Sequence, residues 1–162
     1  MTETTEPTGL DFSTVTLDMA MGALSDVVEA AGLDFVYEPE PGAYNCRYVH
    51  GDAGDARPGC IVGRALHRLG APLGQLASHE GEAVSGMYSL AYHVREVLGA
   101  AQAVQDAPYI SRPATPEERA ADLASATWGH ALLAAHHGAV HWLYHGYTNR
   151  ERVLAVLGPM AP

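Results

Sequence analysis

The sequence predicts a single α+β domain, mainly helical, in which a small two-stranded antiparallel hairpin packs against about five helices. Its 162 residues suit one domain with a substantial core, and 48% of them are hydrophobic, which is typical of globular proteins. Helical periodicity covers most of the chain, whereas strand-like segments are confined to residues 34–50. Residues 1–12 are acidic, polar and without periodicity, so we expect a flexible arm there and a globular domain over 13–162.

Apolar residues recur at helical spacing in five segments, which we expect to form helices: 17–31, 60–69, 82–106, 116–136 and 149–157. Gly32 is suited to end the first of them. Two helices have a capping box at their start, Thr115 with Glu118 and Thr148 with Glu151. These signals predict where the helices begin and end.

The predicted hairpin precedes the second helix. Asp34–Glu38 is aromatic and β-branched, and Tyr44–His50 alternates in polarity. The Pro-Glu-Pro-Gly segment between them, residues 39–42, predicts a turn. Two strands alone are marginally stable, so the helices must pack on them.

The charge distribution restricts the class of partner. The chain has 19 acidic residues and 9 basic ones, all Arg, for a net charge of −10. This balance disfavours direct nucleic-acid binding and an anionic membrane surface, and it suits a basic protein partner. The N-terminus is not a secretory signal, so we expect a cytoplasmic protein. A homo-oligomer is also compatible with the sequence.

Cys60 is a candidate nucleophile. A thiol at a helix start, one turn from Arg64, gains thiolate character, and His50 or His67 would be the base. In the alternative interpretation, Cys60 is a small apolar residue that packs on the hairpin. A cytoplasmic location favours free thiols over a Cys46–Cys60 disulfide, although such a bridge is sterically feasible and would contribute about 3 kcal/mol.

Two residue sets have the chemistry of a metal site. Cys46, His50, Cys60 and His67 supply zinc ligands, but their spacing matches no common zinc motif. If the helix predicted over 116–136 continues past Gly138, His137 and His141, four residues apart, lie in line with His130 and His145, without nearby carboxylates. We therefore expect no cofactor, and we interpret these polar and aromatic residues as a binding surface: Arg64, His67, His137, His141, His145 and Trp142.

Four segments together resemble a family of small proteins encoded by actinobacteria and by the phages that infect them: Cys46-Arg-Tyr-Val49, Pro58–Gly70, Ala101–Asp106 and Trp128–Ala131. The resemblance covers about residues 15–135, and its most specific part is the C-[IL]-V-G-x-A-L helix. Residues 108–126 are longer than in the family, and the His-rich tail after residue 136 is particular to this chain. The resemblance implies a phage or mobile-element origin and no catalytic residues.

We therefore expect a non-enzymatic binding or regulatory protein of phage or mobile-element origin, acting through protein contacts in an actinobacterial host. No nucleotide-binding or hydrolase motif is present in the sequence. One alternative is a thiol-dependent enzyme or redox protein that uses Cys60. A second alternative is a metal-binding protein that uses the Cys/His set or the C-terminal histidines.

Overall fold

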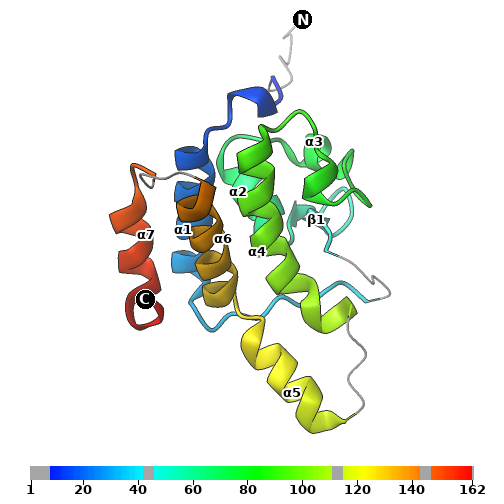
Figure 1. Ribbon diagram of the computed structural model, residues 1–162. Helices are drawn as coiled ribbons and strands as arrows, with labels where there is room; N and C mark the ends of the chain where they lie inside the picture. Colours follow the sequence, from blue (N-terminus) through cyan, green and yellow to red (C-terminus); the bar gives the residue numbers. More distant parts are fainter. Residues whose placement is uncertain (1–7, 42–45, 111–114, 143–146, 162) are drawn as a thin grey trace, which may run out of the picture.

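The computed structural model describes residues 8–41, 46–110, 115–142 and 147–161. Within these ranges the chain forms a mainly helical α+β domain, with helices side by side and a short hairpin at one edge (Figure 1). The α-helices are α1 (Leu17–Ala31), α2 (Ile61–Arg68), α3 (Leu73–Ala77), α4 (Tyr92–Ile110), α5 (Pro116–Ser125), α6 (Trp128–Trp142) and α7 (Arg150–Leu157). The strands are β1 (Val49–His50) and β2 (Arg57–Pro58), and short 3-10 helices cover Phe12–Thr14, Val84–Gly86 and Gly158–Met160.

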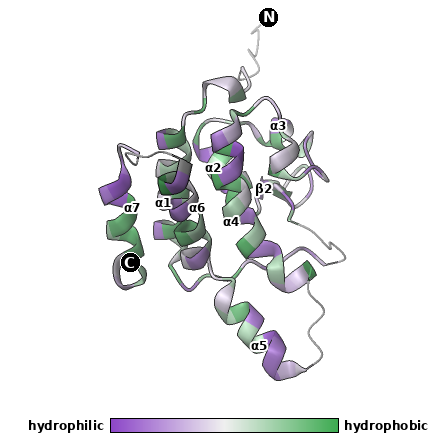
Figure 2. Ribbon diagram, in the orientation of Figure 1, coloured by the Kyte–Doolittle hydropathy of each residue, from purple (hydrophilic) through white to green (hydrophobic). Residues whose placement is uncertain are grey.

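The core lies between α4 and α6, which pack along one another, and α1, which contacts α2, α6 and α7. Each of these helices contributes an apolar stripe that is fully buried, including Met21, Leu24, Leu66, Leu98, Leu132 and Trp128. By contrast, α5 projects from the body and buries no residue completely. Figure 2 shows hydrophilic residues at its free end. No helix in the described ranges is long and apolar enough to cross a membrane.

The two-stranded antiparallel hairpin is confirmed, but its predicted strand pair is wrong. β1 pairs with β2, and residues 51–56 form the turn. After β2, the backbone N–H groups of Gly59 and Cys60 donate to the carbonyls of Tyr48 and Arg47. Residues 59 and 60 therefore stay beside the segment that precedes β1. The segment 34–38 instead lies at the start of α6, where Trp128 N donates to Phe35 O. Residues 44 and 45 lie outside the described ranges.

Most helix predictions are confirmed, with shifts that have local causes. α1 ends at Gly32, which has φ 97°. The expected helix 82–106 begins later, because Val84 N donates to Gln102 Oε1 and folds residues 81–86 back beside α4. The expected helix 116–136 is divided at Thr127, which forms an isolated bridge with Val36. No sequence pattern predicted α3.

One of the two predicted capping boxes is present. Glu118 N donates to Thr115 Oγ1 at 3.1 Å, and Thr115 N donates to Glu118 Oε2 at 3.0 Å. The box predicted at Thr148 is wrong, because Thr148 N donates to the Asp18 carboxylate at 2.7 Å instead. This bond ties the start of α7 to the first turn of α1.

Part of the segment predicted as an arm belongs to the folded domain. Residues 1–7 lie outside the described ranges, but Leu10 is held by the Gln75 side chain through both its N–H and its carbonyl. Phe12 is only 4% exposed and belongs to the core. The folded domain therefore begins before residue 13.

Candidate functional site

The two cysteines are joined in a disulfide, and the expectation of free thiols is wrong. Their Cα atoms lie 5.7 Å apart, and no cysteine is free. The backbone bond from Cys60 N to Arg47 O brings the start of α2 against the segment that follows Cys46. Cys60 is completely buried and forms the N-cap of α2. It is therefore not an exposed thiolate.

Two glycines allow the start of α2 to dock on the segment around Tyr48. A Cβ atom on Gly63 would lie 2.3 Å from the Tyr48 carbonyl oxygen, and one on Gly59 would lie 2.3 Å from that of Arg47. Both neighbours are backbone atoms that hold hydrogen bonds, so they cannot move aside freely. The most specific part of the family-like motif is thus explained by backbone packing.

Arg64, a predicted binding residue, makes its polar contacts inside the domain. Its Nε donates to Gly59 O at 3.0 Å, and its guanidinium lies 4.7 Å from the Trp128 ring centroid. Phe35 packs on the same group at 5.4 Å. These contacts favour a structural role for Arg64.

The two histidines proposed as bases are also engaged within the domain. His50 Nε2 lies 2.6 Å from the Tyr37 hydroxyl, and burial lowers the pKa of His50. His67 Nδ1 bonds to Ala71 O at 2.9 Å, just past the end of α2. Because Cys60 carries no free thiol, the predicted nucleophile–base pair is not assembled in the oxidised protein.

The C-terminal histidines lie on α6, where His137 and His141 are exposed. His145 lies outside the described residues, as does the side chain of Trp142. Within the described chain, no three His, Cys, Asp or Glu side chains are grouped to hold a metal. His136, which no sequence pattern distinguishes from its neighbours, is buried and bonds to the Tyr147 hydroxyl at 2.8 Å.

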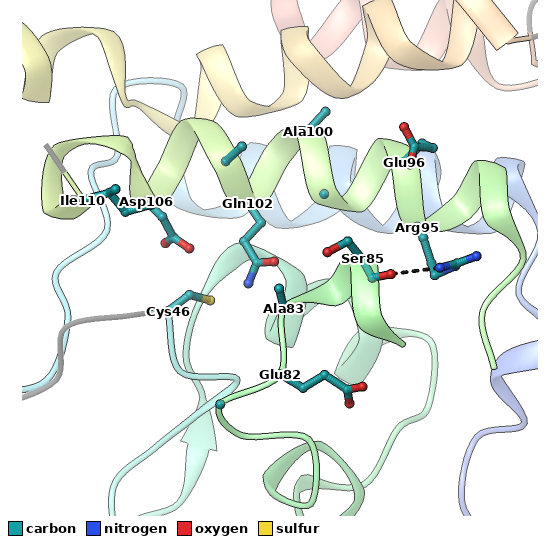
Figure 3. Close-up of a pocket in the computed structure, with 13 residues that line it drawn as sticks. Cys46, Glu82, Ala83, Ser85, Arg95, Glu96, Ala100, Gln102, Asp106 and Ile110 are labelled. Atoms are coloured by element: carbon teal, nitrogen blue, oxygen red, sulfur yellow. Dashed lines mark hydrogen bonds between the residues drawn. The ribbon is translucent and has the colours of Figure 1, made fainter. Parts of the chain in front are cut away.

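A cavity of about 560 Å³ lies between α4 and residues 81–86 (Figure 3). The lining residues that α4 contributes recur every three or four positions, so they lie on one face of the helix. Small residues line much of it, with charged and amide side chains between them. The lining residues are Cys46, Gly81, Glu82, Ala83, Ser85, Arg95, Glu96, Gly99, Ala100, Gln102, Ala103, Asp106 and Ile110.

Asp106 is the least usual residue of this pocket. Its carboxylate points into the cavity toward Cys46 (Figure 3), and its Oδ1 accepts a hydrogen bond from Gln105 Nε2 at 2.9 Å. Burial raises the pKa of Asp106 to about 6. Within the described residues, no cation forms an ion pair with it. The ionised carboxylate is therefore costly in this position.

Gln105 fixes the backbone beside Asp106. Its Oε1 accepts from Ile61 N at 2.8 Å and from Trp128 Nε1 at 3.1 Å. One buried amide thus joins α2, α4 and α6 at the base of the pocket. The segments around residues 101–106 and 128–131 thus meet through this side chain.

Arg95 lines the opposite end of the pocket and contacts two aromatic rings outside the lining. Arg95 Nη1 donates to Ser85 O at 2.8 Å, and its guanidinium lies 4.7 Å from the Tyr88 ring and 5.7 Å from that of Tyr92. Tyr88 is 81% exposed. From Arg95 to exposed Ile110, α4 extends about 22 Å at 1.5 Å per residue. The pocket is therefore long enough for an extended peptide.

No protein-family model matches the sequence, and comparison with curated proteins and with solved structures found no match. The interpretation of the site therefore rests on its own geometry. The sequence does contain a signal for the pocket: Gln102, Gln105 and Asp106 place polar groups on or beside the buried face of α4. Such residues amid an apolar stripe indicate a polar function at that position.

Proposed function

We propose that the protein is a non-enzymatic binding protein whose pocket along α4 holds a basic segment of a partner protein. In this proposal, Asp106 pairs with an arginine or lysine of that segment. The observation that carries the proposal is the half-buried Asp106 carboxylate, which has no ion-pair partner among the described residues. A cationic ligand would supply the missing charge.

The surroundings of Asp106 suit a basic peptide. The lining contains the carboxylates of Glu82, Glu96 and Asp106 against the single guanidinium of Arg95. Small residues between these groups leave room for the methylene stem of an arginine or lysine. A wall of about 22 Å spans six or seven residues in extended conformation. The net charge of −10 favours the approach of a basic partner.

The proposed setting is the cytoplasm of an actinobacterial host, with the protein encoded by a phage or mobile element. Its support is the resemblance of four sequence segments to proteins of that origin. The same acidity that attracts a basic peptide repels nucleic acid and anionic lipid, so neither is proposed as a direct partner.

The proposal predicts that a peptide with one basic side chain binds in the pocket. The probes are a blocked alanine peptide of about seven residues with a central arginine, and the same peptide with citrulline, which is neutral and nearly isosteric. At pH 7.5 the arginine peptide should bind with a Kd about tenfold lower than that of the citrulline peptide, because it makes one charge-assisted hydrogen bond more. NMR titration of the protein measures both values and locates the shifted amides on α4.

The matched variants are Asp106→Asn and Glu29→Gln, which make the same change in net charge. Glu29 is exposed on α1, outside the pocket lining. Asp106→Asn should abolish the preference for arginine, and Glu29→Gln should keep it. Equal affinity of the native protein for both peptides, or loss of the preference in Glu29→Gln, would contradict the proposal.

A further inference from the structure

The Cys46–Cys60 disulfide is asymmetric with respect to solvent. Cys46 is 9% exposed and lines the pocket, and its sulfur faces the cavity (Figure 3), whereas Cys60 is 0% exposed. A thiol that enters the pocket therefore meets the sulfur of Cys46, and the sulfur of Cys60 stays inside the core.

The two sulfurs also differ in how well they hold negative charge. Cys60 is the N-cap of α2, and its Sγ accepts a hydrogen bond from Gly63 N at 3.4 Å. A helix N-terminus stabilises a thiolate. Cys46 instead lies in the segment before β1 and lines the cavity together with Asp106. Attack on Cys46 thus places the leaving electron pair on the sulfur that the helix N-terminus stabilises.

We propose that this disulfide is a thiol–disulfide exchange site, which oxidises a dithiol presented in the pocket through attack on Cys46. The inference does not depend on the basic peptide, although both ligands would enter the same cavity. If the protein acts in the cytoplasm, as proposed, this role accords with the rule that cytosolic disulfides are mainly catalytic or redox-sensing.

The exchange takes two displacement steps. A thiolate of the dithiol attacks Cys46 Sγ, the bond between Cys46 and Cys60 breaks, and its electron pair leaves on Cys60 Sγ. The second thiolate of the dithiol then attacks the first sulfur of the same dithiol, which is bonded to Cys46, and releases Cys46 as a thiolate. Two electrons pass to the protein, and the two protons of the dithiol end on Cys46 and Cys60. The dithiol leaves as a disulfide.

The test exposes the native oxidised protein briefly to reduced glutathione, quenches the exchange with acid, and then unfolds the protein in excess alkylating reagent for peptide mass mapping. The short exposure and the quench capture the mixed disulfide before a second glutathione or the freed Cys60 thiolate displaces it, so the adduct marks the sulfur attacked. We expect glutathione on Cys46 and the alkyl group on Cys60, in protein that retains its native circular dichroism. Glutathione on Cys60, or reduction no faster than global unfolding, would overturn the proposal.

Two single-cysteine variants give an independent measure, and each lacks the bridge equally. Cys60→Ser leaves Cys46 free and supplies a hydroxyl that suits the N-cap. Cys46→Ser leaves only the buried Cys60. With an aromatic disulfide reagent, Cys46 in Cys60→Ser should react about tenfold or more faster than Cys60 in Cys46→Ser. Equal rates in the folded variants would contradict the assigned direction of attack.

Discussion

Replacing Gly63 with alanine should lower the free energy of unfolding by about 2 kcal/mol or more, although alanine favours helices. The added Cβ would lie 2.3 Å from the Tyr48 carbonyl oxygen and 2.8 Å from its Cα. Both are backbone atoms, and that carbonyl accepts the Gly59 N–H bond at 2.8 Å. The start of α2 would have to move away from residues 47 and 48, which follow the bridged Cys46.

Urea unfolding of Gly63→Ala and of Gly138→Ala gives the comparison. Gly138 also lies within a helix, but its added Cβ would meet only Val97 Cγ1 at 3.7 Å, an ordinary contact. There we expect a gain of about 0.5 to 1 kcal/mol from helix propensity. A Gly63→Ala protein as stable as the native chain would show that the close approach to Tyr48 is not a constraint.

Asp106→Asn should stabilise the folded protein at pH 7.5 by about 2 kcal/mol and have little effect near pH 4. Burial raises the pKa of Asp106 from 3.8 to about 6. The folded state therefore binds this proton more tightly than the unfolded state does. Its stabilising contribution is fully present below the unfolded pKa and is lost as pH rises through the folded pKa.

The measurement is urea unfolding of both proteins at pH 4 and pH 7.5, with Glu29→Gln as the charge control. Asparagine keeps the acceptor for Gln105 Nε2, so the native bond at 2.9 Å survives the change. Glu29→Gln should show no such gain at pH 7.5. An Asp106→Asn protein less stable than the native one at pH 7.5 would mean that groups within the folded protein already stabilise the ionised carboxylate.

These two expectations distinguish packing from function in the same domain. Gly63 is needed for the close fit of α2, and its replacement should only destabilise. The Asp106 carboxylate costs stability at neutral pH, and asparagine would remove that cost. A residue that weakens the fold while it lines a pocket is a candidate binding group, because strongly shifted pKa values are common at functional sites.

Local signals predicted the helices well. The apolar spacing of α1 and its end at Gly32, the cap at Thr115 and the helix start at Cys60 are all set by neighbours in sequence. The incorrect predictions concern residues whose contacts are far away in the sequence. Thr148 bonds to Asp18 across 130 positions, and residues 34–38 pair with the start of α6 rather than with a neighbouring strand. Periodicity carries no information about such contacts.

The site was harder to predict for a similar reason. Cys60 was correctly placed at a helix start, but an inferred reducing compartment outweighed the steric feasibility of the Cys46 bridge. The sequence pattern assigns no role to Asp106, because its burial depends on residues 81–86 folding back along α4. The sequence shows that a carboxylate is present but not which surface covers it.

The most direct test of the central claim is the pKa of Asp106 itself, measured by carbon-13 NMR of its carboxyl group with and without the arginine peptide. In the free protein the pKa should lie near 6. Saturation with the peptide should lower it, because a paired cation favours the ionised form. A pKa near 3.8 in the free protein, or one that the peptide leaves unchanged, would contradict Asp106 as the cation-binding group.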